Sequence, residues 1–328
     1  MMMFGNLDVA VGHAQAPPQD ASASDWTRVP EADWARVKPE AAGYSSARLE
    51  ALRAWLKTQQ TTAMLVAVHG NVIFEYGDLS RVSKVASVRK SVLAMLYGNY
   101  VVSGKIDTDK TVKELGLDDT QPFLPIEEHA TLEQLLVPRS GIYLPNGSYG
   151  QDEATPKRGS EYPGTHFFYN NWDFNAAGAA FEKLTGKNIY DALENDLARP
   201  IGRQDFVQER QKKIPTKVSV HPEYAMSLST RDTARLGLLM GRLGRWNDRQ
   251  VHLRTGAATS RASSPRLKTS IPLPFAYLGG LIAGAMGHFG GYGMPSFLAI
   301  SLMGRFRGRT APWDPGGNLL LCCLRPTW

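Results

Sequence analysis

Hydrophobic and polar residues follow a pattern along the chain that predicts a mixture of helices and strands from about residue 39 onward. Leu49, Leu52 and Leu56 share one face of a helix that begins near Ser45. Two runs rich in β-forming residues, 64–68 and 72–76, flank a turn at 69–71 that contains glycine and asparagine. The pattern therefore predicts a surface helix followed by a β-hairpin.

A second group of patterns predicts a mainly helical region. No proline occurs from 87 to 102 and no charge from 92 to 102, which is typical of a helix buried on nearly all sides. Further helix signals, separated by loops, lie between 105 and 185, and the last of them, the run 175–184, is closed by Gly186. Another helix begins after the N-capping Ser229 and ends at Gly241.

Length and composition exclude several classes of protein. The 328 residues, 43% of them hydrophobic, are enough for a large core, so a disordered or fibrous chain is excluded. The longest apolar runs are about half of the roughly 20 residues that a membrane span needs. The two cysteines, Cys322 and Cys323, are neighbours, so we predict neither a disulfide framework nor a cysteine metal site.

The net charge of +6 is concentrated late in the chain. Nine lysines and arginines lie from Arg249 onward, with Asp314 as the single acid, whereas the preceding residues are nearly neutral. The late arginines lack helical spacing and interleaved aromatic residues, so we predict no nucleic-acid partner. Residues 12–24 resemble a flexible leader more than a secretory signal, which favours a cytoplasmic location, with the periplasm as the alternative.

The S-x-x-K sequence at Ser87 and Lys90 is the main candidate for catalytic chemistry. Nucleophile elbows, phosphate loops and H-E-x-x-H zinc motifs are absent from the sequence. On a helix the spacing of three places both side chains on one face, and an apolar setting lowers the proton affinity of a lysine, so its amine can deprotonate the serine. Free N–H groups at the start of the helix would favour an oxyanion. The structural alternative is an N-capping serine and a solvated lysine.

A Y-x-N sequence at Tyr169 and Asn171 is the second candidate. Tyrosine can relay a proton, and asparagine can hold an amide or carbonyl of a substrate. The alternative is a half-buried aromatic residue that stabilises the loop. Tyr97 and Asn99 have the same spacing, but ten residues along one helix place Tyr97 about 15 Å from Ser87, too far to take part.

Several segments resemble the serine β-lactamase and penicillin-binding-protein superfamily, in its class C-like branch of esterases and 6-aminohexanoate-dimer hydrolases. They are 86–91 (ASVRKS), 135–141 (LLVPRSG), 169–172 (YNNW), 199–202 (RPIG) and 226–232 (MSLSTRD). The resemblance implies that Ser87 accepts the acyl group, Lys90 takes its proton and Tyr169 passes a proton to the leaving group. It implies no metal and no organic cofactor.

The third motif of the superfamily is not assigned by the sequence. Gly290 begins a glycine-rich turn like the one that follows this motif, which places either 285–287 or 288–290 on the motif. His288, Gly290 and Asn171 are our candidate substrate-binding residues. Neither alternative supplies the lysine that anchors a β-lactam carboxylate, which favours an esterase or amidase over an efficient β-lactamase.

We therefore predict an α/β (α+β) fold of the β-lactamase/transpeptidase type, an antiparallel sheet flanked by helices with an inserted helical lobe. The predicted parts are a flexible leader (1–38), a discontinuous sheet domain (39–85 and 186–303), the helical lobe (86–185) and an atypical tail (304–328). The predicted function is hydrolysis of a small ester or amide, and β-lactams are a further candidate substrate. The rivals are a non-catalytic relative that binds a peptide or acyl ligand, and a basic-tailed interaction protein.

The composition of residues 251–328 leaves two explanations open. The segment has no glutamate, one aspartate and many small residues, and an apolar run ends abruptly after Met303. A shift of the reading frame would produce this composition, and so would ordinary divergence of a surface tail. If the frame has shifted, we expect the sheet to lack its proper last strand and the chain to be unstable or inactive.

Overall fold

A three-stranded antiparallel sheet forms one side of the molecule. The computed structural model describes residues 29–59, 61–146, 155–242, 244–252 and 319–324. Strand β1 (Ala63–Val68) lies between β2 (Asn71–Gly77) and β9 (Leu319–Leu324) and is antiparallel to both. His69 and Gly70 turn the β1–β2 hairpin with φ angles of 53° and 79°, the left-handed conformation that tight hairpins favour. The predicted hairpin is thus present.

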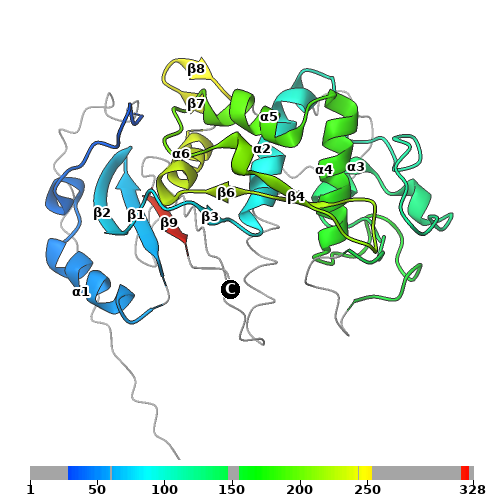
Figure 1. Cartoon of the computed structure of the whole chain (residues 1–328), viewed down its shortest axis with the longest axis horizontal. Helices are drawn as coiled ribbons and strands as arrows, with labels where there is room; N and C mark the ends of the chain where they lie inside the picture. The colour runs from blue at the N-terminus through cyan, green and yellow to red at the C-terminus, as the bar shows by residue number, and fades with distance from the viewer. Residues whose placement is uncertain (1–28, 60, 147–154, 243, 253–318, 325–328) are drawn as a thin grey trace, which may run out of the picture.

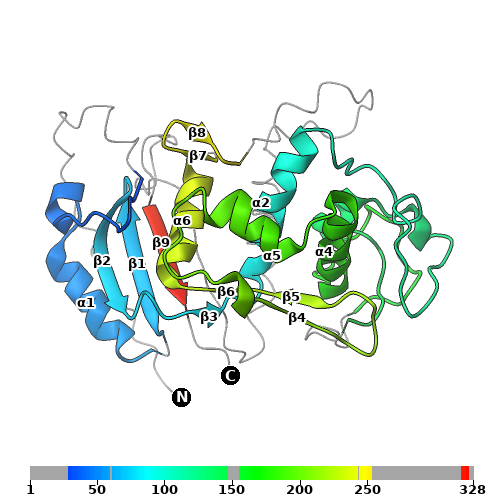
Figure 2. The same ribbon diagram turned by 45° about the horizontal axis from the view of Figure 1, so that its top comes forward.

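Helices cover both faces of this sheet (Figures 1 and 2). Helix α1 (Ser46–Leu56) is capped by Ser45, and its last residue belongs to a small core with Met64, Val66 and Phe74. Helix α6 (Thr230–Gly241) lies on the opposite face, against β1 and β9. The alternating faces of β1 therefore contribute to two cores, as expected for a strand covered on both sides.

A helical region follows the sheet in the chain and shares its main core. Helices α2 (Val88–Val102) and α4 (Asn171–Thr185) pack together, and the hydroxyl of Tyr97 donates to the carbonyl of Ala177 at 2.6 Å. Short helices α3 (Leu132–Leu136) and α5 (Ile189–Ala192) pack against α4, and α5 continues into the π-helical segment η4 (Leu193–Ala198). The main core includes residues from both the sheet and these helices.

Short elements complete the described part of the chain. Strand β3 (Ser83–Lys84) pairs with β6 (Ser227–Leu228), β4 (Lys212–Ile214) with β5 (Glu223–Ala225), and β7 (Arg245–Trp246) with β8 (Arg249–Gln250). Three 3-10 helices are η2 (Pro39–Ala42), η3 (Glu127–His129) and η5 (Gln208–Arg210). Strand β3 lies shortly before α2 in the chain, and its pairing with β6 helps to position the first turn of α2.

The described structure differs from two predicted boundaries. Residues 29–38, which we assigned to the flexible leader, include the buried Val29 and Trp34. Strand β9 lies within the predicted atypical tail, 304–328, and pairs along β1 over its full length. The division into a sheet domain and a helical lobe otherwise remains a prediction.

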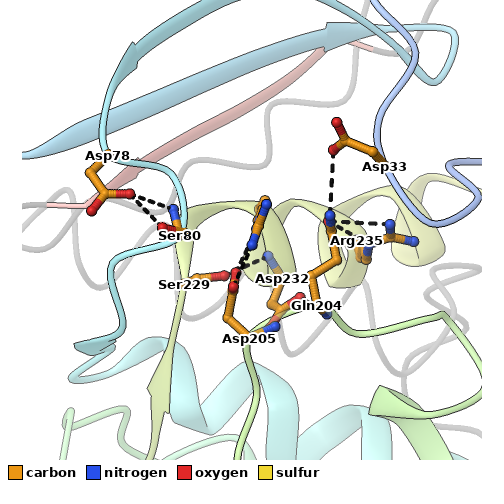
Figure 3. Close-up of polar contacts among 9 residues, drawn as sticks. Asp33, Asp78, Ser80, Gln204, Asp205, Ser229, Asp232 and Arg235 are labelled. Atoms are coloured by element: carbon orange, nitrogen blue, oxygen red, sulfur yellow. Dashed lines mark hydrogen bonds and ion pairs between the residues drawn. The ribbon is translucent and has the colours of Figure 1, made fainter.

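Arg235 explains why residues 29–38 are ordered. Its buried guanidinium donates to the carbonyls of Pro30 at 3.1 Å, Glu31 at 2.8 Å and Ile201 at 2.9 Å. One turn earlier on α6, Asp232 accepts the backbone N–H of Gln204 at 2.7 Å and that of Asp205 at 2.9 Å (Figure 3). This polar cluster attaches residues 29–38 to α6. Composition does not reveal the attachment, because Arg235 is 205 residues from Pro30 and 204 from Glu31 in the sequence.

Candidate active site

Ser87 and Lys90 come from the first turn of α2. Ser87 directly precedes the helix, and Ala86 before it has a φ of 41°, a left-handed conformation that alanine rarely adopts. One helical turn then places Lys90 Nζ 3.3 Å from Ser87 Oγ. The predicted pairing of these two side chains on one helix face is therefore present in the structure.

Tyr169 and Asn171 reach the same point from α4. The Asn170 side chain caps this helix by accepting the Trp172 N–H at 3.1 Å. The Tyr169 hydroxyl donates to Ser87 Oγ at 2.8 Å. Lys90 Nζ donates to that hydroxyl and, at 2.6 Å, to Asn171 Oδ1. Two helices thus bring four polar side chains into one hydrogen-bonded group.

Burial determines the protonation states in this group. Lys90 is 1% exposed, and burial, helped by the positive charge of Arg89, holds the pKa of its amine well below the ordinary value. Burial also raises the pKa of the Tyr169 hydroxyl, which the hydrogen bond to Ser87 only partly offsets. Burial therefore favours the neutral form of the Lys90 amine and the protonated form of the Tyr169 hydroxyl beside Ser87.

A second group of hydrogen bonds holds the loop before α4. Ser140 Oγ donates to Asp173 Oδ1 at 2.7 Å and accepts the Ile142 N–H at 2.9 Å. Asn170 Nδ2 donates to the carbonyl of Ile142 at 2.7 Å. Burial raises the pKa of the Asp173 carboxyl well above its ordinary value. These contacts connect the 140–142 loop to the start of α4 and thereby fix the position of Tyr169.

The structure limits which N–H groups at the start of α2 could favour an oxyanion. We expected its free N–H groups to favour an oxyanion. Instead, the N–H groups of Val88, Arg89 and Lys90 donate to carbonyls three residues earlier, at 2.9, 3.3 and 3.0 Å. These three donors are used within the tight first turn, so they do not face a reacting carbonyl.

The remaining predicted site residues have different outcomes. His288 and Gly290, and with them both alternatives for the third motif, lie outside the described residues. Asn171 touches Lys90, and its role toward a substrate stays a prediction. The hydroxyl of Tyr97 faces α4 instead of Ser87, as its exclusion predicted.

Sequence reasoning gave no role to Arg89 or Asp173, both of which are buried beside the site. For Asp173 the available signal was an acidic residue inside a segment rich in aromatic residues. Within the part of the chain that the structure describes, no group of three or more His, Cys, Asp or Glu side chains is arranged to hold a metal ion. In the same residues, no helix has the length and apolar character required to cross a membrane.

Comparison with known proteins identifies the class of this chain. The beta-lactamase family profile matches residues 52–300, well over half of the chain. The fold is therefore of the β-lactamase/transpeptidase type, and both the predicted α/β class and the predicted resemblance are confirmed. The chain belongs to the beta-lactamase family, a family of serine hydrolases that act on small-molecule substrates.

Solved structures that resemble this chain are distant from it in sequence. One from Bacillus anthracis, proposed to be a 6-aminohexanoate-dimer hydrolase, is 19% identical, with 62% of this chain and 59% of that chain covered and a TM-score of 0.47. A beta-lactamase from Mycobacterium bovis is 21% identical, with 56% of each chain covered and a TM-score of 0.38. A class C beta-lactamase in complex with cefoxitin is 16% identical, with 62% and 67% covered and a TM-score of 0.46. The chain thus spans 59% of the length of the Bacillus anthracis protein.

Proposed function

We propose that the protein is a serine hydrolase that cleaves a small ester or amide through an acyl-enzyme on Ser87. The observation that carries this proposal is the buried Lys90 amine 3.3 Å from Ser87 Oγ, with the Tyr169 hydroxyl hydrogen-bonded to both. An exposed lysine would be protonated and unable to take a proton from the serine. The family to which the chain belongs supports the same reaction class.

In the acylation step, Ser87 Oγ attacks the carbonyl carbon of the substrate while its proton passes to the neutral Lys90 amine. The bond from the carbonyl carbon to the leaving oxygen or nitrogen then breaks. Tyr169 donates its proton to the leaving group and regains one from the Lys90 ammonium. The step therefore leaves Lys90 neutral, Tyr169 protonated and Ser87 acylated.

In the deacylation step, a water molecule attacks the acyl carbon. Tyr169 and Lys90 together take the proton of this water and return one to Ser87 Oγ as the ester bond breaks, by the reverse of the first sequence. The acid product leaves and the resting hydrogen bonds form again. Asn171 keeps the Lys90 amine oriented in both steps through its 2.6 Å contact.

Esters and amides are preferred over β-lactams as substrates in this proposal. Neither sequence alternative for the third motif contains the lysine that would pair with a β-lactam carboxylate. The 6-aminohexanoate-dimer hydrolase proposed for the Bacillus anthracis protein is likewise an amide-cleaving activity, which makes short linear amides part of the substrate panel.

Labelling with a serine-reactive fluorophosphonate tests the proposal. We expect the wild-type chain to be labelled and the Ser87→Ala variant to remain unlabelled. Ser91→Ala is the matched control, since this serine lies one turn along the same helix, and it should be labelled like the wild type. If a folded wild-type chain is not labelled and hydrolyses no ester, amide or β-lactam, the non-catalytic ligand-binding alternative holds instead.

A further inference from the structure

Arg89 lies between the two catalytic residues of α2 and is almost completely buried. It is 2% exposed, although a charged side chain is rarely buried at this depth without a specific partner. Its Nη2 donates to Asn175 Oδ1 on α4 at 2.9 Å, and its Nε lies 3.8 Å from Glu223 Oε1 on β5. The guanidinium also stacks over the Tyr224 ring, 4.2 Å from its centre. One side chain of α2 therefore contacts both α4 and β5.

The geometry points to Arg89 as a positioning residue that holds α2 against α4 and β5 and whose fixed positive charge keeps Lys90 in its neutral form. The inference rests on the proposed function, because a neutral amine matters only if Lys90 is the base. The guanidinium contacts of Arg89 described above are with Asn175, Glu223 and Tyr224, and none of them is with Ser87, Lys90 or Tyr169. It acts through Lys90 and through the fit of the two helices.

Burial alone does not explain the placement of this arginine. Its Nη1 is buried with no hydrogen-bond partner among the described residues, so the guanidinium is only partly satisfied. A buried charge with incomplete partners lowers stability, and an apolar side chain of similar size would fill the same space with less loss. An apolar side chain would supply neither the contacts with Asn175, Glu223 and Tyr224 nor a positive charge beside the Lys90 amine.

The charges around Lys90 oppose one another. The titratable or charged groups near it are Arg89 on α2, Tyr169 and Asp173 at the start of α4, and Glu223 on β5, whereas the neighbouring Tyr224 packs against Arg89. Burial is the largest cause that lowers the pKa of the Lys90 amine, and Arg89 lowers it further by repulsion, whereas Glu223 and, to a smaller extent, Asp173 raise it by attraction. Arg89 and Glu223 form a pair whose two members act on Lys90 with opposite sign.

Opposite charge deletions separate this role from a merely structural one. The measurement is kcat/KM for a p-nitrophenyl ester as a function of pH. This kcat/KM rises with pH as Lys90 loses its proton. Arg89→Met should move this rise to higher pH by about one unit, a loss of about tenfold at any pH on the slope. Glu223→Gln should move the rise to lower pH. Arg89→Lys keeps the positive charge but not the guanidinium contacts. It should therefore lower the maximal kcat/KM and leave unchanged the pH at which kcat/KM rises.

Arg231→Met is the matched control. Arg231 forms an ion pair with Asp205, with Nε 2.6 Å from Oδ2, so its loss removes an arginine pair of the same kind elsewhere. This variant should be less stable without any shift of the pH profile. If Arg89→Met and Glu223→Gln both leave the rise in place, or move it in the same direction, the inference is overturned.

A readout without turnover keeps the inference separate from the proposed function. The Lys90 resonance of protein labelled with ¹³C at the lysine ε-carbon, assigned by its loss in Lys90→Arg, reports the protonation of the amine directly. We expect this resonance to titrate at higher pH in Arg89→Met and at lower pH in Glu223→Gln, even if no ester is hydrolysed. Absence of hydrolysis with these shifts would refute the proposed function alone, and hydrolysis without them would refute the role of Arg89 alone.

Discussion

Replacing Tyr169 by phenylalanine tests the proton relay with little change to the packing. The ring of Tyr169 contacts Phe174 at 5.8 Å between centroids and lies 4.0 Å from Lys90 Nζ, and a phenylalanine ring keeps both contacts. Only the hydroxyl, 2.8 Å from Ser87 Oγ, is lost. The hydroxyl bonds both Ser87 and Lys90, so we expect the free energy of unfolding to fall by about 1–3 kcal/mol, the usual contribution of two hydrogen bonds.

The two chemical steps should respond very differently to this change. Lys90 Nζ still lies 3.3 Å from Ser87 Oγ and 2.6 Å from Asn171 Oδ1, so the base for acylation remains in place. An aryl ester releases a phenolate that needs little protonation, so acylation should fall by about tenfold or less. Deacylation needs the relay between water and Lys90, and its loss should lower that rate by about 10²–10⁴.

Stopped-flow measurement with p-nitrophenyl acetate distinguishes these outcomes. The variant should release close to one equivalent of p-nitrophenol in a burst and then turn over slowly, and mass spectrometry should find the acetyl group on the peptide that contains Ser87. Tyr97→Phe is the control, because it removes another buried tyrosine hydroxyl, bonded to Ala177, without touching Ser87. A Tyr169→Phe enzyme with the wild-type steady-state rate and no burst would reduce Tyr169 to a structural aromatic residue.

Three further predictions follow from the buried groups of the site. Ser87→Ala and Lys90→Ala should each abolish ester hydrolysis, and the double variant should be no worse than either, because the two residues act as one unit; additive losses would contradict this. Lys90→Met should be inactive yet more stable than the wild type in urea near neutral pH, where the wild-type chain must deprotonate the lysine to fold. This stability difference should shrink as pH rises toward the ordinary lysine pKa of 10.5, and a constant difference would contradict the buried neutral amine. For Asp173, whose folded pKa is raised, stability of the wild type should fall as pH rises above the ordinary pKa of 3.8, since only the unfolded carboxyl then ionises. In urea, the free energy of unfolding of Asp173→Asn should therefore increase relative to that of the wild type as pH rises. The opposite trend would contradict a raised pKa of the Asp173 carboxyl.

The local elements of the fold were predictable from the sequence. The apolar stretch from 87 to 102 predicts a helix, and α2 occupies Val88–Val102. The hairpin likewise follows from two β-rich runs around a turn. The start of α4 was placed at 175 instead of Asn171, because its first turn is rich in aromatic residues, which favour other conformations as readily. Asn170 as N-cap and an acidic residue in the first turn were the signals for the correct start.

The site was predictable only where its contacts are local. The spacing of Ser87 and Lys90 is a property of one helical turn, so it could be derived from the sequence. The contact of Tyr169 with Ser87 depends on how α2 packs on α4, and only the family resemblance suggested it. The burial of Arg89 and of Asp173 depends on tertiary packing in the same way, which is why neither received a role.

The assembly of this site from two helices has a consequence for how the molecule folds. Ser87 and Lys90 are three residues apart, whereas Ser87 and Tyr169 are separated by 82. Closing the longer loop costs about 3 kcal/mol more chain entropy than closing the shorter one. Ser87 and Lys90, the proposed nucleophile and base, can therefore meet as soon as α2 forms, but Tyr169, the proposed relay, joins them only when the intervening chain has folded and α4 has docked. Partial loosening of α4 would then remove turnover of an ester while most of the helical circular-dichroism signal remains. Ester hydrolysis would therefore report a loss of native packing that a measurement of helix content does not detect.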